Sequence, residues 1–298
     1  MVQIYGESLR NFETDTTIMF KEDTLAGKRI LVTGGGSGLG LAMARAFASV
    51  GAKVAICGRT EAKLQAAAPS LGSQGGYWVC DVRDYDAVGR MFDEIYDRWG
   101  GLDGLVNNAA GNFLCASEDL TPGGFKAVVD IVLHGTFNCT QHFGKRQIAA
   151  RRPGTILNIV ATYTETGCAF VLPSACAKAG VYAMTTTLAY EWGVYGIRCV
   201  AIAPGPFPTE GAWSRLVPDP RFQQTMLEKH PMRRVGDASE LAHLAVFLMS
   251  DMAPYINGEC VVIDGGERLQ GSEFNAYSHF APREQLKEIF RALKPSKK

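Results

Sequence analysis

The sequence lacks several features that would assign a protein to a functional class. Its 298 residues carry 30 lysine or arginine and 30 aspartate or glutamate side chains, so the formal net charge is zero. Such a balance argues against a basic surface for nucleic acid, and no apolar run is long enough to cross a bilayer. Residues 1–28 mix both signs of charge, unlike a signal or transit peptide. We therefore expect a cytoplasmic protein with no nucleic-acid partner and no membrane span.

The cysteine and histidine patterns of disulfide-rich and metal-binding domains are also missing. The chain has eight cysteines and five histidines, yet no cysteines form a C-x-x-C pair and no histidines have ligand spacing. Several cysteines, Cys57 and Cys199 among them, fall inside apolar runs. We expect free thiols in a reducing compartment and no metal site.

One glycine-rich stretch dominates what is present. An apolar run at residues 30–32 predicts a buried strand, glycines follow at Gly34, Gly38 and Gly40, and strong helix formers fill residues 41–48. Glycine lets the backbone turn tightly beside a pyrophosphate, and the helix start offers free N–H groups and a positive dipole end. The stretch predicts a dinucleotide site, with wider spacing than the usual G-x-G-x-x-G.

Strand and helix patterns alternate from this turn to about residue 270, with no linker between them. The alternation predicts an α/β fold, a single Rossmann-like doubly wound parallel sheet with helices on both faces. We expect an N-terminal leader at residues 1–27, a dinucleotide-binding catalytic domain at 28–270, and a C-terminal extension with a short helix at 271–298. The apolar stripe of that helix favours docking on the body of the domain.

The end of the second strand indicates which dinucleotide binds. In such folds an acidic residue about 20 residues beyond the glycine turn binds the ribose 2′-hydroxyl of NAD. This chain has Gly58 and Arg59 there. A missing carboxylate removes repulsion, and a guanidinium can bind a 2′-phosphate with two hydrogen bonds. The pair favours NADP(H); the alternative is an ordinary surface arginine at a strand end.

Chemistry is expected beyond the carboxyl ends of the strands, where open α/β sheets bind their ligands. This rule predicts that residues 107–113, 161–174 and 204–213 lie around the nicotinamide. The last of these ranges belongs to a segment that resembles a lid and runs to about residue 231.

Four side chains in or near these segments can move protons or hold a negative oxygen. Ser174 and Lys178 lie one turn apart on one helix face, and a lysine there would bind ribose hydroxyls and lower the pKa of a nearby phenol. Tyr163 and Asn112 both donate hydrogen bonds that suit a developing oxyanion. Alternatively, Ser174 only caps the start of its helix.

Four motifs in order resemble the short-chain dehydrogenase/reductase superfamily over about residues 26–266. They are Thr33-Gly34-x-x-x-Gly38-x-Gly40, Asn107-Asn108-Ala109-Ala110-Gly111, the helix lysine Lys178 and Pro204-Gly205. Three positions depart from the superfamily pattern. Ser174 stands where the catalytic tyrosine is usual, the usual serine falls near Ala161 or Thr162, and His134 takes the place of a helix asparagine. The departures argue against an ordinary carbonyl-reducing proton relay.

A narrower resemblance accounts for these departures. From about residue 26 to 275 the chain is similar to the 2,4-dienoyl-CoA reductases, chiefly the mitochondrial type. The matching segments are Gly111-Asn112-Phe113, Asp130-Ile131-Val132-Leu133, Tyr163-x-Glu165-Thr166-Gly167, Pro173-Ser174-Ala175-x-Ala177-Lys178-Ala179-Gly180, Pro204-Gly205-Pro206 and Gly271-Ser272-Glu273-Phe274-Asn275. The resemblance implies that Tyr163 and Asn112 hold the thioester oxygen, while Ser174 and Lys178 support the site and bind the cofactor.

The resemblance also implies a reaction. NADPH gives a hydride to Cδ of a 2,4-dienoyl-CoA thioester, charge moves to the thioester oxygen, and protonation of Cα, by water, yields 3-enoyl-CoA in the β-oxidation of unsaturated fatty acids. The residues expected at the cofactor are Thr33, Gly34, Gly36, Ser37, Gly38, Leu39, Gly40, Arg59, Asp81, Val82, Asn108, Ala109, Ala110, Gly111, Lys178, Pro204, Gly205 and Pro206.

Two other functions stay open: a short-chain reductase acting on another conjugated enoyl or 3-oxoacyl substrate, and a non-catalytic NADP-binding protein. The expected partner is an acyl-CoA thioester. The family further implies a homo-oligomer, a tetramer, joined through helices at residues 125–150 and 173–192. Small residues expected to allow close approach there are Ala175, Ala177, Ala179, Gly180 and Ala183.

Overall fold

A computed structural model describes residues 20–209, 217 and 219–293. Its sheet has seven parallel strands in the order β3-β2-β1-β4-β5-β6-β7. Their bounds are β1 Arg29–Thr33, β2 Lys53–Gly58, β3 Gly76–Val79, β4 Gly104–Asn107, β5 Gly154–Ile159, β6 Ile197–Pro204 and β7 Cys260–Ile263. The order reverses between β1 and β4, which confirms the predicted doubly wound sheet.

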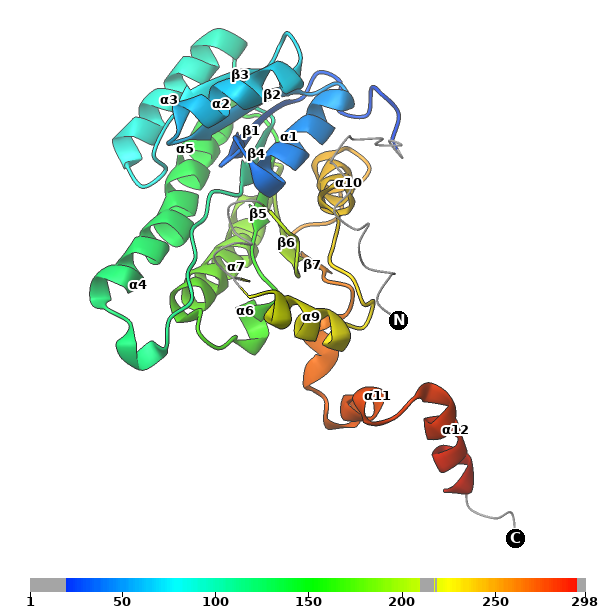
Figure 1. Ribbon diagram of the computed structural model, residues 1–298. Coiled ribbons are helices and arrows are strands. Elements are labelled where there is room, and N and C mark those ends of the chain that lie inside the picture. Colours follow the sequence, from blue (N-terminus) through cyan, green and yellow to red (C-terminus); the bar gives the residue numbers. More distant parts are fainter. Residues whose placement is uncertain (1–19, 210–216, 218, 294–298) are drawn as a thin grey trace.

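Helices cover both faces of this sheet (Figure 1). Against one face lie α1 Gly38–Ser49, α2 Glu61–Ala67 and α10 Ala238–Met249. Against the other lie α3 Tyr85–Trp99, α4 Pro122–Val129, α5 Gly135–Ala150 and α7 Leu172–Gly193. The remaining helices are the short α6 Tyr163–Thr166, α9 Pro220–Lys229, α11 Tyr277–Phe280 and α12 Arg283–Ala292. None of the helices described combines the length and apolar character needed to cross a membrane.

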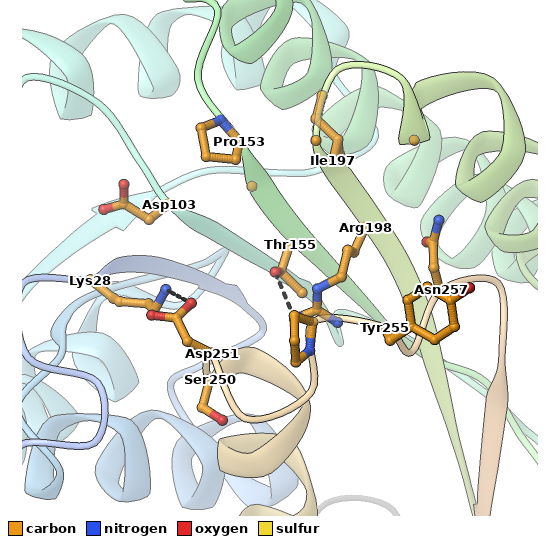
Figure 2. A pocket seen from close by; sticks show the side chains of 14 residues that line it. Lys28, Asp103, Pro153, Thr155, Ile197, Arg198, Ser250, Asp251, Tyr255 and Asn257 are labelled. Carbon is orange, nitrogen blue, oxygen red and sulfur yellow. Dashed lines mark hydrogen bonds and ion pairs between the residues drawn. The ribbon is translucent and has the colours of Figure 1, made fainter.

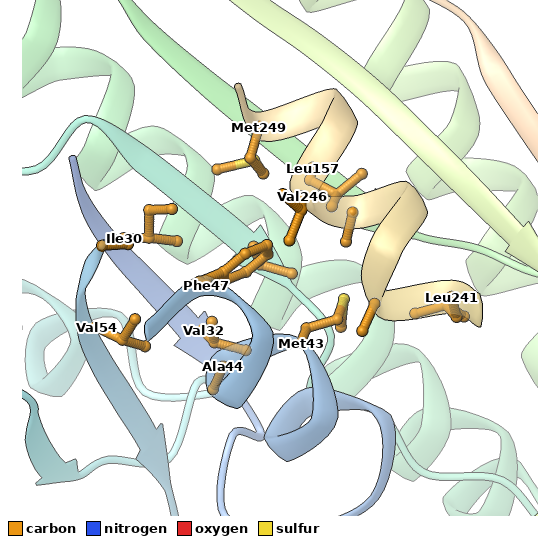
Figure 3. Packing of buried hydrophobic residues seen from close by; sticks show 14 of the residues in the cluster. Ile30, Val32, Met43, Ala44, Phe47, Val54, Leu157, Leu241, Val246 and Met249 are labelled. Carbon is orange, nitrogen blue, oxygen red and sulfur yellow. The ribbon is translucent and has the colours of Figure 1, made fainter. Parts of the chain in front are cut away.

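The central strands are buried on both faces. Ile30 and Val32 of β1 point into one core with Phe47 of α1 and Val246 of α10, as Figure 3 shows, whereas the intervening Leu31 points into the core on the opposite face. Adjacent strand residues face opposite ways, so a continuous apolar run serves both cores. The carboxyl ends of these strands are thereby held rigid where the site is expected.

The region predicted as one helix over residues 125–150 is three elements. After α4 the chain makes a π-helical turn at Asp130–His134 before α5 begins. Val132 is the buried residue of this turn, while the His134 side chain is 60% exposed and lies 3.1 Å from Asp130. His134, which stands where the family has a helix asparagine, is therefore a helix-surface histidine whose ring faces solvent.

The chain beyond β7 leaves the body of the domain. It forms two 3₁₀ turns, Glu267–Gly271 and Glu273–Ala276, before α11 and α12, and Figure 1 shows those helices leading away. Phe290 of α12 packs against Tyr277 of α11, with ring centroids 5.5 Å apart. The predicted docking of this helix on the body is wrong, because its apolar stripe meets α11 instead.

At the other end, the described part of the predicted leader, residues 20–27, contributes to the core. Leu25 is fully buried, and its N–H donates to Val50 O at 2.8 Å. A domain boundary after residue 27, as predicted, would therefore separate Leu25 from the core residues that surround it. Residues 1–19 of the predicted leader lie outside the described part of the chain.

Candidate active site

A cavity of about 580 Å³ lies at the edge of the sheet opposite the predicted site (Figure 2). Its charged groups already serve the fold: Lys28 pairs with Asp251 at 2.6 Å, and Arg198 donates to Leu248 O at 2.7 Å and to Thr155 Oγ1 at 3.1 Å. The cavity contains none of the predicted site residues. We therefore build the site from the carboxyl ends of the strands.

The end of β1 is tied to the end of β4 by one hydroxyl. Thr33 Oγ1 accepts hydrogen bonds from the N–H groups of Asn108 and Ala109, both at 3.0 Å, and donates to Val106 O. The Asn108 side chain donates back to Thr33 O at 3.0 Å. These bonds fix the glycine turn beside the Asn108–Gly111 segment, as the sequence predicts.

The glycine turn has the backbone that a phosphate cradle needs. Gly34 and Gly38 have φ of +66° and +55°, which other residues rarely adopt. A Cβ on Gly34 would lie 3.0 Å from Ala109 Cα, and one on Gly38 would lie 3.2 Å from the Thr209 side chain. Ser37 makes no capping bond to the first turn of α1, so those N–H groups remain available to a phosphate. These residues fit a dinucleotide.

Thr209 is a residue that the sequence analysis missed. It lies on the segment after β6, and its contact with Gly38 brings that segment over the glycine turn. The available signal was its position, five residues after Pro204 within the range already expected near the nicotinamide. Residues 210–213 of that range, including Trp213, lie outside the described residues.

A charged cluster lies at the ends of β2 and β3. Arg83 donates to Asp81 at 2.6 Å, and this hydrogen bond lowers the pKa of the Asp81 carboxyl, with a smaller contribution from Arg59. Two guanidinium groups thus surround one carboxylate, and Arg59 is exposed beside it. The sequence analysis found Arg59 and Asp81 but missed Arg83.

The phenol of Tyr163 and the hydroxyl of Ser174 lie 2.9 Å apart. Ser174 is 2% exposed inside α7, so the alternative that it only caps the helix is wrong. Burial raises the pKa of Tyr163, while the bond to Ser174 opposes the rise. The predicted lowering of this pKa by Lys178 is not seen, because that lysine is bonded elsewhere.

Lys178 is buried one turn after Ser174, and its ammonium donates to Ile159 O at the end of β5. Burial lowers its pKa to about 8. A buried cation with one backbone acceptor has two further N–H donors to offer. The position fits a group that binds ribose hydroxyls of a cofactor.

Asn112 follows β4 on the Asn108–Gly111 segment. Its side-chain oxygen accepts the N–H of Phe113 at 2.9 Å, so its amide nitrogen can donate to another group. Amide and phenol donors thus follow adjacent strands, since β4 pairs with β5. Together they can hold a negative oxygen.

The remaining predicted cofactor residues lie along the same carboxyl edge. Gly205 N donates to Ile263 O at 2.9 Å, which joins the segment after β6 to β7. The others are Gly36, Leu39 and Gly40 at the start of α1, Val82 after β3, Ala110 after β4, and Pro204 and Pro206 around Gly205. The described residues contain no group of three or more side chains placed to hold a metal ion.

The family model described as enoyl-(acyl carrier protein) reductase matches residues 34–267. A Bacillus subtilis (strain 168) protein named probable 2,4-dienoyl-CoA reductase [(2E)-enoyl-CoA-producing] is 44% identical over 251 residues, 83% of this chain and 99% of the relative. A Caenorhabditis elegans protein named probable 2,4-dienoyl-CoA reductase 3 [(3E)-enoyl-CoA-producing] is 42% identical over 270 residues, 88% and 85% of the two chains.

Solved structures agree with these matches. A short chain dehydrogenase from Bacillus anthracis str. 'Ames Ancestor' is 44% identical, covers 82% of this chain and 98% of its own, and superposes with a TM-score of 0.76. A gluconate 5-dehydrogenase from Burkholderia cenocepacia J2315, in complex with NADP and tartrate, is 33% identical, covers 83% and 98%, and has a TM-score of 0.78.

Proposed function

The chain belongs to the short-chain dehydrogenase/reductase family of oxidoreductases, which bind a nicotinamide cofactor, and from this premise we propose that it reduces 2,4-dienoyl-CoA thioesters to 3-enoyl-CoA with NADPH. The observation that carries the proposal is the 2.9 Å bond between Tyr163 and Ser174. The phenol of Tyr163 comes from the turn after β5. The position on α7 where the catalytic tyrosine is usual carries Ser174 instead. A serine hydroxyl is too weak an acid to protonate an alkoxide efficiently.

Reduction of a conjugated thioester needs no alkoxide to be protonated. When bound, NADPH supplies a hydride to Cδ of the substrate. Charge then collects on the thioester oxygen, and Tyr163 and Asn112 donate hydrogen bonds to it from fixed positions. Fixed donors stabilise such a charge without reorganising at the moment of reaction. Lys178 holds the cofactor ribose, and Ser174 orients the phenol.

The names of the relatives differ in the product that they specify, one with the remaining double bond at position 2 and the other at position 3. We propose the 3-enoyl product, formed when Cα receives the proton, in the oxidation of unsaturated acyl chains. The test is loss of NADPH absorbance with a 2,4-dienoyl-CoA, followed by identification of the product. No oxidation with this substrate would contradict the proposal.

A second candidate is reduction of a simple enoyl thioester, because the matching family model carries that description. The same two donors would hold the oxygen. Parallel assays with a 2-enoyl-CoA and a 3-oxoacyl-CoA separate the candidates. Activity with the dienoyl-CoA alone supports the first, and no activity with any of them supports a non-catalytic NADP-binding protein.

The choice of NADPH over NADH rests on the two arginines at the adenosine end. A 2′-phosphate placed beside Arg59 and Arg83 gains charge-assisted hydrogen bonds, each worth roughly 1.5–3 kcal/mol. We expect Arg59→Ala to weaken NADPH about tenfold to hundredfold and to leave NADH binding unchanged, measured by cofactor fluorescence titration. An unchanged NADPH affinity would contradict the assignment of Arg59.

A further inference from the structure

Glu267 is a half-buried carboxyl that the proposed reaction has not used. It begins the 3₁₀ turn after β7, where its N–H donates to Asp264 O at 3.1 Å. Its Oε2 lies 3.1 Å from the place that a Cβ on Gly205 would occupy. The carboxyl therefore lies over the backbone that leaves β6. Within the part of the chain that the structure describes, no hydrogen bond reaches its oxygens.

Sheet order brings this carboxyl toward Tyr163. Strand β6 is the neighbour of β5, and Tyr163 follows the end of β5. The carboxyl over the end of β6 therefore lies on the strand next to the one that leads to the phenol. Burial and then the Glu267 charge raise the pKa of the Cys168 thiol, and Cys168 adds to the raised pKa of Tyr163.

The surroundings of Glu267 shift the pKa of its carboxyl upward. Burial raises the pKa of its carboxyl, His230 at the end of α9 opposes the rise, and Asp264 adds to it. Two other donors are assigned to other groups. The Lys178 ammonium donates to Ile159 O and is assigned to the cofactor ribose, and the Tyr163 phenol is needed at the thioester oxygen.

We propose that Glu267 is the acid that delivers the proton to Cα, and this rests on the proposed reduction of dienoyl-CoA. After hydride addition at Cδ, the substrate carries an enolate oxygen with double bonds at C1–Cα and Cβ–Cγ. The O–H bond of Glu267 breaks, its proton forms the new C–H bond at Cα, and the enolate electrons re-form the thioester carbonyl. Solvent then reprotonates the carboxylate.

The position of this proton decides the product. The same enolate can accept a proton at Cα, which leaves the double bond at position 3, or at Cγ, which leaves it at position 2. A fixed acid beside the thioester selects Cα, whereas unguided water can reach both carbons. Glu267 therefore determines product identity as well as rate.

The test uses the full chain, NADPH and a 2,4-dienoyl-CoA in D₂O, with product analysis by NMR. The unaltered enzyme is expected to give 3-enoyl-CoA with deuterium at Cα. Glu267→Gln is expected to lower turnover about a hundredfold, the lower end of what a positioned acid contributes, and to release a mixture that includes 2-enoyl-CoA deuterated at Cγ. The exposed carboxyl Glu288 on α12 provides a matched control, and E288Q should behave as the unaltered enzyme.

A second measurement tests the position of the carboxyl without substrate or cofactor. At the alkaline pH where a thiol titrates, the Glu267 carboxyl is ionised. Removing its charge in E267Q should therefore shift the pH profile of Cys168 alkylation to lower pH, while exposed Cys176 in the same sample stays unchanged. Where E267Q does not fold, Glu267→Asp carries the test, with the 3-enoyl product formed at least about tenfold more slowly at unchanged KM.

The outcomes separate the two proposals. If the unaltered enzyme oxidises no NADPH with a dienoyl-CoA, both are overturned. If it forms the 3-enoyl product and E267Q forms the same product at the same rate, or E267D keeps full turnover, the Glu267 proposal alone is overturned.

Discussion

The hydrogen bond between Tyr163 and Ser174 joins two side chains that are eleven residues apart. Tyr163 begins the short helix α6, whereas Ser174 lies in the first turn of α7. The bond therefore orients a phenol of the short helix α6 relative to α7, one of the longest helices. The serine orients, and the phenol donates to the substrate.

Removing the phenolic hydroxyl tests this division of roles. Tyr163→Phe keeps the ring packing but loses one donor to the developing oxyanion, which typically costs about 10²–10³ in turnover. We expect kcat to fall by that factor with little change in KM. Steady-state kinetics with a dienoyl-CoA measure both.

Ser174→Ala is the matched control for that prediction. It removes only the group that orients the phenol, so its effect on kcat should be smaller than that of Tyr163→Phe. Asn112→Ala should resemble Tyr163→Phe, because it removes the other donor. A crippled S174A beside a nearly normal Y163F would reverse the roles assigned to the two hydroxyls.

The charge on Lys178 predicts a pH dependence. Burial lowers its pKa to about 8 from the ordinary 10.5, so the free enzyme loses this ammonium as pH rises through about 8. The free energy of unfolding changes in the opposite direction. It rises with pH between the folded and unfolded pKa values, because below the folded pKa the folded state carries a buried charge. NADPH affinity should fall as the pH rises through about 8. Fluorescence titrations at several pH values measure it.

Lys178→Arg provides the control, because a guanidinium stays charged throughout this range. Its NADPH affinity should be lower at neutral pH, where its shape fits less well, but independent of pH up to about 10, well below the guanidinium pKa. A flat profile for the unaltered enzyme would show that Lys178 keeps its proton and would contradict the assigned pKa.

The positions of residues agree with the sequence where a motif supplied a local frame. Gly34 and Gly38 lie on the glycine turn, and Tyr163 and Asn112 follow strand ends, while the roles given to them stay predictions. Arg83 was missed because its role depends on a contact with Asp81 two residues away, which no periodicity reveals. The π turn that ends at His134 was missed too, because the residue pattern continues the helix through it.

At the scale of elements, the buried strands were the most predictable part. Ile30, Leu31 and Val32 form one apolar run whose side chains enter the two cores. Because none of them faces solvent, every position in the run must be apolar. Partners of amphipathic helices were less predictable. The stripe on α12 indicates that one face is covered, but not that α11 covers it.

The boundary of the N-terminal leader gives a test at the same scale. Leu25 packs in the core with Val50 and Phe47, and it is fully buried. Leu25→Ala should lower the free energy of unfolding by about 2–5 kcal/mol, the range for large-to-small core changes. Denaturant unfolding measures it. Equal stability would show that residues 20–27 lie outside the cooperative core.

At the scale of the whole molecule, the carboxyl edge divides into two parts. The ends of β1, β2 and β3 hold the glycine turn and the arginine pair, and those of β4, β5, β6 and β7 hold Asn112, Tyr163 and Glu267. The order of strands reverses between the two parts, which is where a ligand binds in such sheets. A cofactor bound across the reversal between β1 and β4 therefore contacts the groups proposed to hold the substrate with only one of its two ends.

The outer helices carry exposed apolar side chains that a single copy leaves uncovered. Along α7 and just past its end, Tyr190 is 93% and Val194 is 82% exposed, and Phe137 of α5 is 44% exposed. Ala177 and Gly180, which were expected to face a partner, instead face their own chain: Ala177 is fully buried, and a Cβ on Gly180 would lie 3.0 Å from Leu133. Contiguous exposed apolar side chains mark interaction surfaces.

The family resemblance implies a homotetramer, and these side chains lie on or next to α5 and α7, the helices expected to join it. Light scattering should give a tetramer for the unaltered chain, and the double variant Tyr190→Glu, Val194→Glu should give a smaller species, because burying two carboxylates in an interface is costly. NADPH should still bind, since the glycine turn lies at a different part of the molecule. Val79 is 54% exposed on β3, the edge strand at the other side of the sheet, so V79E should leave the tetramer intact. A monomer for the unaltered chain, or a tetramer for the double variant, would place the interface elsewhere.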